Sequence, residues 1–202
     1  MTEDWVRDPD EIYRRSFAVV RAEARLDHLP ADLTDVAIRV IHASGMVDVA
    51  ADLDFSPGAG DLGRAALRRG APVLVDAEML AAGIIRSGLP AANQIVCTLG
   101  EVAATPGMTR SALAVDRWDP WLEGAVVAIG NAPTALFRLL ERLAEGAPRP
   151  ALILGFPVGF IGAAESKRAL AQSGHPFIAL HGRRGGTAMA AAAINALTKG
   201  CA

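Results

Sequence analysis

The chain has 202 residues, of which 51% are hydrophobic and only 5% aromatic, and its formal net charge is −2. A chain of this length can bury a substantial core, and an aliphatic composition favours helices packed closely on a sheet. The small net charge argues against nucleic acid as a partner, because such surfaces carry a large basic excess. The longest apolar run, residues 151–164, contains Gly and Pro and is too short to span a bilayer, so we expect no membrane association.

The chain has two cysteines, Cys97 and Cys201, and neither lies in a spacing typical of metal ligands. We therefore expect no disulfide framework, no protein-bound metal and a reducing compartment. The N-terminus is charged from its third residue and is not a secretory signal, which favours a cytoplasmic protein.

Two helices are predicted at the N-terminal end. The first opens at Asp8-Pro9 and continues to about residue 26. The second covers residues 32–44, where apolar residues recur at the spacing of one helical face and acidic residues occupy the first turn. Gly45 is the expected stop, because glycine readily takes the left-handed conformation that closes a helix.

His42 falls in the last turn of this second helix, where the helix dipole favours the imidazolium form. A single histidine at such a position is more often a cap than a catalyst. However, the sequence offers no recognisable Ser-His-Asp or Cys-His arrangement and no obvious carboxylate pair. His42 is therefore the best single candidate for a general acid, and we expect it to hold a proton readily.

The rest of the chain alternates between strands and helices. An extended piece at 46–49, a Pro-Gly loop at 56–60 and a small helix at 63–69 come first. Continuous apolar runs then predict buried strands at 72–77, 94–99, 125–130, 151–155 and 177–181. Helical patterns cover 111–116, 134–145, 163–172 and 187–197. We predict a single α/β domain over residues 1–202, with a largely parallel sheet of about five strands, helices on both faces and an N-terminal helical segment.

Glycines gather where the third, fourth and fifth predicted strands turn into helices. At such turns free backbone N–H groups and the helix dipole favour an anion, although glycines needed only for tight turns fit any single loop equally well. Arg183 and Arg184 in the last loop could bind carboxylates in a bidentate way. For Lys167 a solvated position on a helix is as plausible as ligand contact. The spacings match neither a dinucleotide fingerprint nor a P-loop.

Several segments, in this order, resemble the precorrin-8X methylmutase family of cobalamin biosynthesis. They are SFAVVRAEA, VAIRVIHASGMVDV, GAPVLVDAEML, TRSA, IGNAPTAL, GFPVGFIGAAESK and GRRGGTAMAAAAINAL, which together extend from about residue 8 to residue 197. The resemblance implies a homodimeric isomerase that moves a methyl group from carbon 11 to carbon 12 of precorrin-8X and gives hydrogenobyrinate. It also implies that no redox cofactor, metal or methyl donor takes part.

The family's catalytic histidine matches His42, and its substrate-contacting serine matches Ser16. The reaction is described as a 1,5-sigmatropic shift, which protonation of the macrocycle by His42 would assist. Further residues are weaker candidates for contacts to the carboxylates or the ring: Arg21, Asn93, Arg110, Asn131, Arg183 and Arg184. The resemblance also leaves room for product handover to neighbouring enzymes of the pathway.

Three alternatives stay open. Cobalt-precorrin-8 methylmutase performs the same shift on a metallated ring, and the metal would sit in the substrate. A carrier could hold a tetrapyrrole without chemistry, with His42 only a hydrogen-bond donor. A phosphate-ligand enzyme using the Gly159–Gly162 loop is weaker, because no base or metal ligand accompanies that loop.

Overall fold

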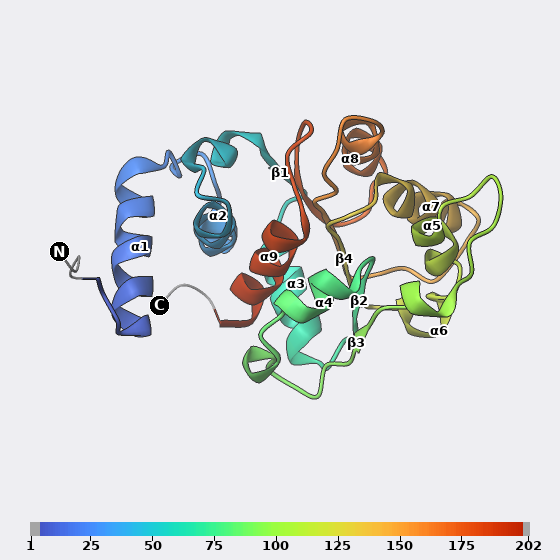
Figure 1. Ribbon diagram of the computed structural model, residues 1–202, viewed down its shortest axis with the longest axis horizontal. Coiled ribbons are helices and arrows are strands. Elements are labelled where there is room, and N and C mark those ends of the chain that lie inside the picture. Colours follow the sequence, from blue (N-terminus) through green and yellow to red (C-terminus); the bar gives the residue numbers. More distant parts are fainter. Residues whose placement is uncertain (1–4, 200–202) are drawn as a thin grey trace.

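The computed structural model describes residues 5–199 and contains a six-stranded sheet in the order β1-β6-β5-β4-β2-β3 (Figure 1). The strands are β1 (Leu53–Phe55), β2 (Val73–Val75), β3 (Ile95–Val96), β4 (Val126–Ile129), β5 (Leu152–Gly155) and β6 (Phe177–Leu180). Strands β2 to β6 pair in parallel, and β1 pairs antiparallel with β6 at the edge. The predicted α/β class and largely parallel sheet are confirmed.

Helices cover both faces of this sheet. They are α1 (Pro9–Glu23), α2 (Ala31–Ser44), α3 (Ala59–Arg68), α4 (Glu78–Gly83), α5 (Arg110–Val115), α6 (Asp119–Leu122), α7 (Pro133–Ala144), α8 (Ala163–Gln172) and α9 (Thr187–Lys199). Short 3-10 helices lie at Val47–Asp52, Arg86–Gly88 and Leu99–Glu101. Helix α9 lies between α2 and the sheet, and α1 lies beyond α2 at one end of the molecule (Figure 1).

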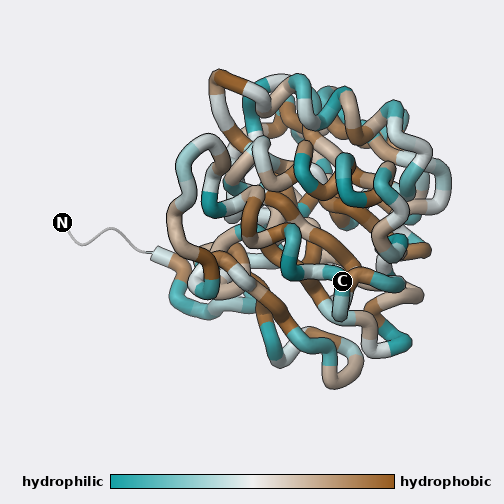
Figure 2. Tube along the Cα trace, turned by 90° about the vertical axis from the view of Figure 1, so that its right-hand side faces the viewer, coloured by the Kyte–Doolittle hydropathy of each residue, from teal (hydrophilic) through white to brown (hydrophobic). Residues whose placement is uncertain are grey.

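The strands alternate their side chains between two separate cores. In β4, for example, Val126 and Ala128 join the core under α2, α3, α4 and α9, whereas Val127 and Ile129 join the core under α5 to α8. Because side chains alternate across a strand, a strand covered on both faces reads as a continuous apolar run. Hydrophobic residues accordingly gather in the middle of the trace (Figure 2).

Helix α2 follows its sequence pattern closely. Its apolar stripe, including Leu33 and Val36, is completely buried. Gly45 ends the helix in the left-handed conformation, with φ 68°, and its N–H donates to the Ile41 carbonyl over 2.8 Å. The helix starts after Pro30, one residue before the expected first position. The predicted helix and its stop signal are therefore confirmed.

Two local predictions are wrong, and some short elements were not predicted. Residues 46–49 are not extended but enter the 3-10 helix Val47–Asp52, and the helix expected at 63–69 starts earlier, at Ala59. Strand β1 was not expected, because three residues carry too little pattern and are fixed only by pairing with β6. Helix α4 was also missed, since it has only six residues.

Among residues 5–199, no helix is both long and apolar enough to cross a bilayer. In the same range no cluster of three or more His, Cys, Asp or Glu side chains could hold a metal ion. Cys97 is a free, half-buried thiol whose pKa burial raises to about 11, which makes it a poor nucleophile. Cys201 lies outside the described residues.

Candidate active site

Ser16 and His42 are two candidate residues whose side chains contact each other directly. Ser16 lies in the middle of α1 and His42 in the last turn of α2, and the Ser16 Oγ is 2.7 Å from the His42 Nδ1. The pair forms because α1 packs on α2 through the buried side chains of Phe17 and Val20. Two residues that lie 26 positions apart in the sequence therefore form one hydrogen-bonded unit.

Aromatic rings and a guanidinium surround the imidazole of His42. The ring centroids of Tyr13 and Phe17 each lie 5.4 Å from that of His42, and Phe17 meets it edge-on. The Arg39 guanidinium lies 5.4 Å above the Phe17 ring. Burial first, and the positive charge of Arg39 second, lower the pKa of His42 below its ordinary 6.5. The expectation that His42 holds a proton readily is therefore wrong for the free protein, because both effects oppose the helix dipole.

A pocket of about 250 Å³ opens beside this unit. Tyr13, Arg39 and His42 form one wall. A second wall comes from the end of α4 and from α9 and is lined by Gly83, Ile85, Ala188, Ala191, Ala192 and Asn195. Ala43 of α2 completes the lining. Small side chains on α9 leave this space open, and the Asn195 side chain fixes the wall by bonding to the backbone of Gly83 and Ile85. The pocket thus pairs an acid–base group with a mostly apolar, rigid wall.

The carboxyl ends of the strands meet near the start of α9. Strand β2 has β3 on one side and β4 on the other, so the order of the strands reverses between β2 and β4. Ligands usually gather at such a switch point of a parallel sheet. There the buried carboxylate of Asp76 accepts hydrogen bonds from the backbone N–H groups of Gly130, Asn131 and Ala132 over 2.7–2.9 Å. Burial raises the pKa of Asp76, and these three donors oppose that rise.

Asp76 corrects one prediction about the glycine loops. The loop after β4 was expected to offer its free N–H groups to an anionic ligand. The protein's own carboxylate already takes those of Gly130, Asn131 and Ala132. The side chain of Asn131 remains exposed at this edge.

The arginine candidates are spread over the molecule. Arg21 lies in the last turn of α1, on the same helix as Ser16. Arg183 is exposed after β6, with its guanidinium 5.3 Å from the Phe160 ring. Arg110 begins α5 on the opposite face of the sheet from α1 and α2, and its guanidinium donates to the carbonyls of Leu99 and Val102 (Figure 1). Within one chain, Arg110 therefore does not share the His42 pocket.

Two candidates are engaged in the protein itself. The buried amide of Asn93 donates to the carbonyls of Leu67 and Ala71, each over 2.8 Å, and so fixes the turn before β3. The guanidinium of Arg184 pairs with the carboxylates of Asp48 and Asp52. In both residues these polar atoms already have partners within the chain, and their role in substrate binding stays a prediction.

Lys167 is also placed differently from either expectation. Its side chain is fully buried, and its Nζ donates to the carbonyls of Pro157, over 3.0 Å, and Arg184, over 2.7 Å. Desolvation lowers its pKa to about 8. It is neither solvated nor placed to meet a ligand directly.

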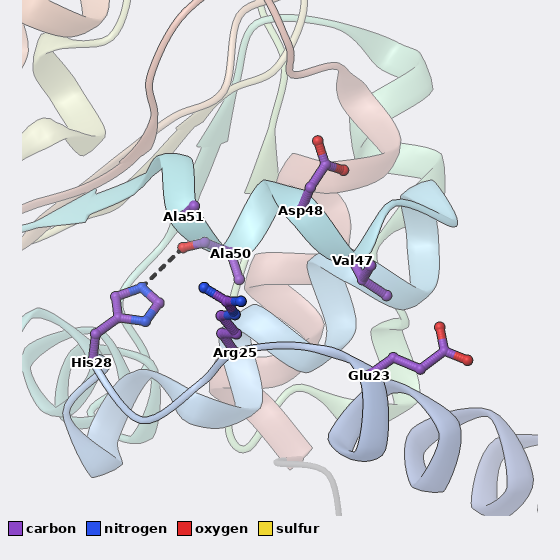
Figure 3. A pocket seen from close by; sticks show the side chains of 7 residues that line it. All are labelled: Glu23, Arg25, His28, Val47, Asp48, Ala50 and Ala51. Carbon is purple, nitrogen blue, oxygen red and sulfur yellow. Dashed lines mark hydrogen bonds between the residues drawn. The ribbon is translucent and has the colours of Figure 1, made fainter.

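A second pocket, of about 450 Å³, lies between the end of α1 and the 3-10 helix Val47–Asp52. Figure 3 shows its lining, with the Arg25 side chain pointing toward Ala50, between His28 on one side and Glu23 on the other. His28 in this lining bonds to the Ala50 carbonyl over 3.1 Å and anchors the loop. His181 pairs with Asp54 over 2.7 Å at the sheet edge. Neither arrangement repeats the Ser16–His42 unit.

Sequence reasoning missed several residues of the site. Tyr13 lies three residues before Ser16 and four before Phe17, so a helical projection would have placed Tyr13 beside both of them. Asp76 directly follows a buried strand, which is itself a signal for a site residue. Arg39 lies one turn before His42, and its effect on the imidazole follows from that spacing.

Comparisons with known proteins agree with this architecture. The family model described as precorrin-8X methylmutase matches residues 11–200. A protein of Pseudomonas aeruginosa named precorrin-8X methylmutase is 62% identical, over 96% of this chain and 97% of its own length. One of the same name from a Sinorhizobium species is 53% identical, over 97% of each. A crystal structure of precorrin-8X methyl mutase from Thermus thermophilus superposes with a TM-score of 0.85, at 38% identity and 94% coverage of both chains.

The resemblance seen in the sequence is thereby confirmed along nearly the whole chain. The matched range includes Ser16, His42, the glycine loops and the wall formed by α9. With its mostly parallel sheet and its Ser16–His42 unit, this chain belongs to the precorrin-8X methylmutase family, a family of isomerases of cobalamin biosynthesis.

Proposed function

We propose that this protein moves a methyl group from carbon 11 to carbon 12 of precorrin-8X, giving hydrogenobyrinate, and that His42 supplies the assisting proton. The observation that carries the proposal is the 2.7 Å contact of Ser16 with His42 beside a pocket, in a chain that matches the family over residues 11–200.

The reaction needs no nucleophile. The bond between the methyl carbon and carbon 11 breaks while the bond to carbon 12 forms, and substrate and product are isomers. Protonation at the macrocycle, which we assign to a ring nitrogen, withdraws electron density as the methyl group moves. His42 takes the proton back when the product forms. A positioned acid of this kind typically contributes about 10² to 10⁴ in rate, and orientation within a fitted pocket adds to it.

Ser16 fixes the imidazole for this task. The lowered pKa makes His42 largely neutral in the free protein at neutral pH. We assign the Ser16 hydroxyl as donor to Nδ1, which leaves the proton on Nε2. When a substrate that carries carboxylates enters, its negative charge favours the imidazolium and offsets the effect of Arg39.

We assign contacts with the substrate to Arg21, Asn131 and Arg183, whose side chains lie on the His42 helix pair or at the carboxyl edge of the sheet. Guanidinium groups suit the acetate and propionate carboxylates of such a macrocycle. Arg110 joins this group only if a second copy of the chain brings it to the site.

We further propose that the protein acts as a homodimer with the site at the interface. A pocket of about 250 Å³ is below the range of roughly 300–1,000 Å³ that encloses a drug-sized ligand. Helix α1 also leaves Ile12, Tyr13 and Val19 exposed beside Ser16. A second copy covering α1 would bury these side chains and complete the enclosure of the substrate.

The test compares wild type with His42→Asn after anaerobic incubation with precorrin-8X. We expect wild type to develop the hydrogenobyrinate absorption spectrum, and the variant to bind the substrate but convert it at least 10²-fold more slowly. The matched control is His175→Asn, which changes a half-buried histidine at the opposite, amino edge of the sheet. Conversion by His42→Asn at the wild-type rate would contradict the assignment of His42.

The same experiment separates the alternatives. A carrier would bind precorrin-8X with no change of spectrum in wild type. A cobalt-precorrin-8 methylmutase would convert the metallated substrate and leave the metal-free one unchanged. The relatives from Pseudomonas aeruginosa and Sinorhizobium are both named precorrin-8X methylmutase, after the metal-free substrate, which supports precorrin-8X as the substrate here.

The proposal also covers the domain organisation, the location in the cell and the fate of the product. The chain acts as one domain, which is supported by a single family match across residues 11–200. It works in the cytoplasm, where a biosynthetic family of this kind meets its substrate. It passes its product directly to the next enzyme of the pathway.

A further inference from the structure

Lys167 is one of two lysines in the chain, and its ammonium group is buried beneath two loops. The first loop follows β5 and covers residues 156–162, and the second follows β6 and covers residues 181–186. From α8, the Lys167 Nζ donates to the Pro157 carbonyl in the first loop and to the Arg184 carbonyl in the second. One side chain therefore joins two loops at the carboxyl edge of the sheet.

Backbone contacts join the same two loops. The Gly159 N–H donates to the Arg183 carbonyl over 3.1 Å, and the Gly186 N–H donates to the Phe156 carbonyl over 2.7 Å. At Gly185 the chains approach so closely that a Cβ would lie 2.3 Å from the Phe156 carbonyl oxygen. The geometry of one loop is thus set by the other.

The outer side of this pair carries an unusual combination of side chains. Phe160 and Ile161 are 84% and 91% exposed, at the tip of the first loop. The Arg183 guanidinium lies over the Phe160 ring, whereas the neighbouring Arg184 turns inward to Asp48 and Asp52. A cation beside exposed apolar side chains matches the edge of a macrocycle that combines apolar ring surface with carboxylates.

The buried amine is costly. Desolvation lowers its pKa to about 8, and a methionine of similar length would fill the same space without that penalty. A methionine would, however, leave the Pro157 and Arg184 carbonyls without this donor. Beyond filling space, the amine therefore holds the loop after β5 and the loop after β6 at a fixed distance through these two hydrogen bonds.

We propose that Lys167 is a positioning residue, which holds the two loops together so that Arg183 and Phe160 present one contact surface to the edge of the substrate. This inference rests on the proposed function, because it takes a corrinoid polycarboxylate as the ligand. Lys167 itself touches neither the substrate nor the reacting atoms.

The test is the split between KM and kcat for precorrin-8X in Lys167→Met. We expect KM to rise about tenfold with kcat within about twofold of wild type, because the Ser16–His42 unit lies on other elements. The matched control is Arg168→Met, which removes the adjacent, exposed cation of α8 and should leave both constants unchanged. A fall in kcat with unchanged KM would overturn the proposal.

A double-mutant cycle with Arg183→Ala separates positioning from general destabilisation. If Lys167 acts through Arg183, the double variant should show little more loss than either single variant. Additive effects on KM would overturn the proposal. If Lys167→Met does not fold, the cycle is run with Arg183→Ala and Phe160→Ala in the native background, where additive effects again contradict a joint contact surface.

Failure of the proposed function has a different signature. Wild type that converts precorrin-8X while Lys167→Met keeps its KM overturns the inference about Lys167 alone. Wild type that does not convert precorrin-8X overturns the proposed function. The role of Lys167 is then judged from the Kd of hydrogenobyrinate, which the same variants should weaken about tenfold.

Discussion

Ser16 of α1 and His42 of α2 share a hydrogen bond of 2.7 Å between Oγ and Nδ1, and this bond ties the outermost helix to the pocket. A hydroxyl that donates to Nδ1 keeps the proton on Nε2, where a ring nitrogen of the substrate could receive it. The geometry of the acid thus depends on the packing of α1 against α2.

Removing this hydroxyl should slow the reaction without abolishing it. We expect Ser16→Ala to lower kcat about tenfold, the equivalent of one hydrogen bond of about 1.4 kcal/mol. Single-turnover absorption measurements would give the rate. The control, Ser173→Ala, removes a hydroxyl that bonds to the Leu170 carbonyl at the amino edge. A wild-type rate for Ser16→Ala would show that the imidazole is oriented without the serine.

The charge of Arg39 should be visible in the titration of His42. Because a neighbouring cation disfavours the imidazolium, Arg39→Gln should raise the pKa of His42 towards its ordinary 6.5, although burial still holds it lower. Proton NMR titration of the four histidines, with the His42 signal identified by its loss in His42→Asn, measures the change. Arg14→Gln, on the exposed side of α1, should not move the signal.

Asp76 should contribute strongly to stability. In Asp76→Asn, one carboxylate oxygen becomes an NH₂ group that faces backbone N–H donors of the loop after β4. We expect a loss of about 1–3 kcal/mol in the free energy of unfolding, measured by urea denaturation. Asp61→Asn, at a side chain that is 78% exposed, should change it little. Equal stability of the two variants would mean that the loop holds its shape without Asp76.

The close approach of Gly185 to the backbone of Phe156 and Pro157 leads to a second prediction about stability. A Cβ there would lie 2.3 Å from the Phe156 carbonyl oxygen and 2.7 Å from that of Pro157, so Gly185→Ala must push the two loops apart. We expect a destabilisation of about 1–3 kcal/mol and a weaker affinity for hydrogenobyrinate. Gly100→Ala adds a Cβ with nothing within 4 Å and serves as the control in thermal denaturation.

Lys167 should make stability depend on pH in alkaline solution. Its pKa is about 8 in the folded protein and near the ordinary 10.5 when unfolded. Between these values the unfolded chain binds more protons than the folded one, so the free energy of unfolding rises with pH across this window. The stability gained in this way is lost again as the pH falls through about 8. Urea denaturation at several pH values should show that wild type gains stability relative to Lys167→Met across the window. Parallel curves would contradict the shift.

The sequence predicted much of this fold, because its signals are local. The apolar stripe and Gly45 gave helix α2 almost to the residue, and the continuous apolar runs located five of the six strands. Strand β1 escaped because only its pairing with β6 defines it. The resemblance to a family supplied Ser16, which no periodicity singles out.

Electrostatic roles were harder to predict, since they depend on contacts between distant segments. Arg183 and Arg184 look equivalent in the sequence, yet only Arg184 meets Asp48 and Asp52. The N–H groups of the loop after β4 look free until Asp76 is seen to accept from them. The same holds for the proton affinity of His42: its place in the helix predicts a raised pKa, whereas burial and the charge of Arg39 lower it.

Helix α9 follows every strand in chain order, yet it lies between α2 and the sheet. During synthesis on the ribosome, the apolar face of α2 must therefore wait for residues 187–197 before it has its main partner. A nascent chain with a long-exposed aliphatic face is prone to aggregate and is a natural client for chaperones. Truncation before residue 187 should consequently yield an insoluble fragment rather than a smaller enzyme.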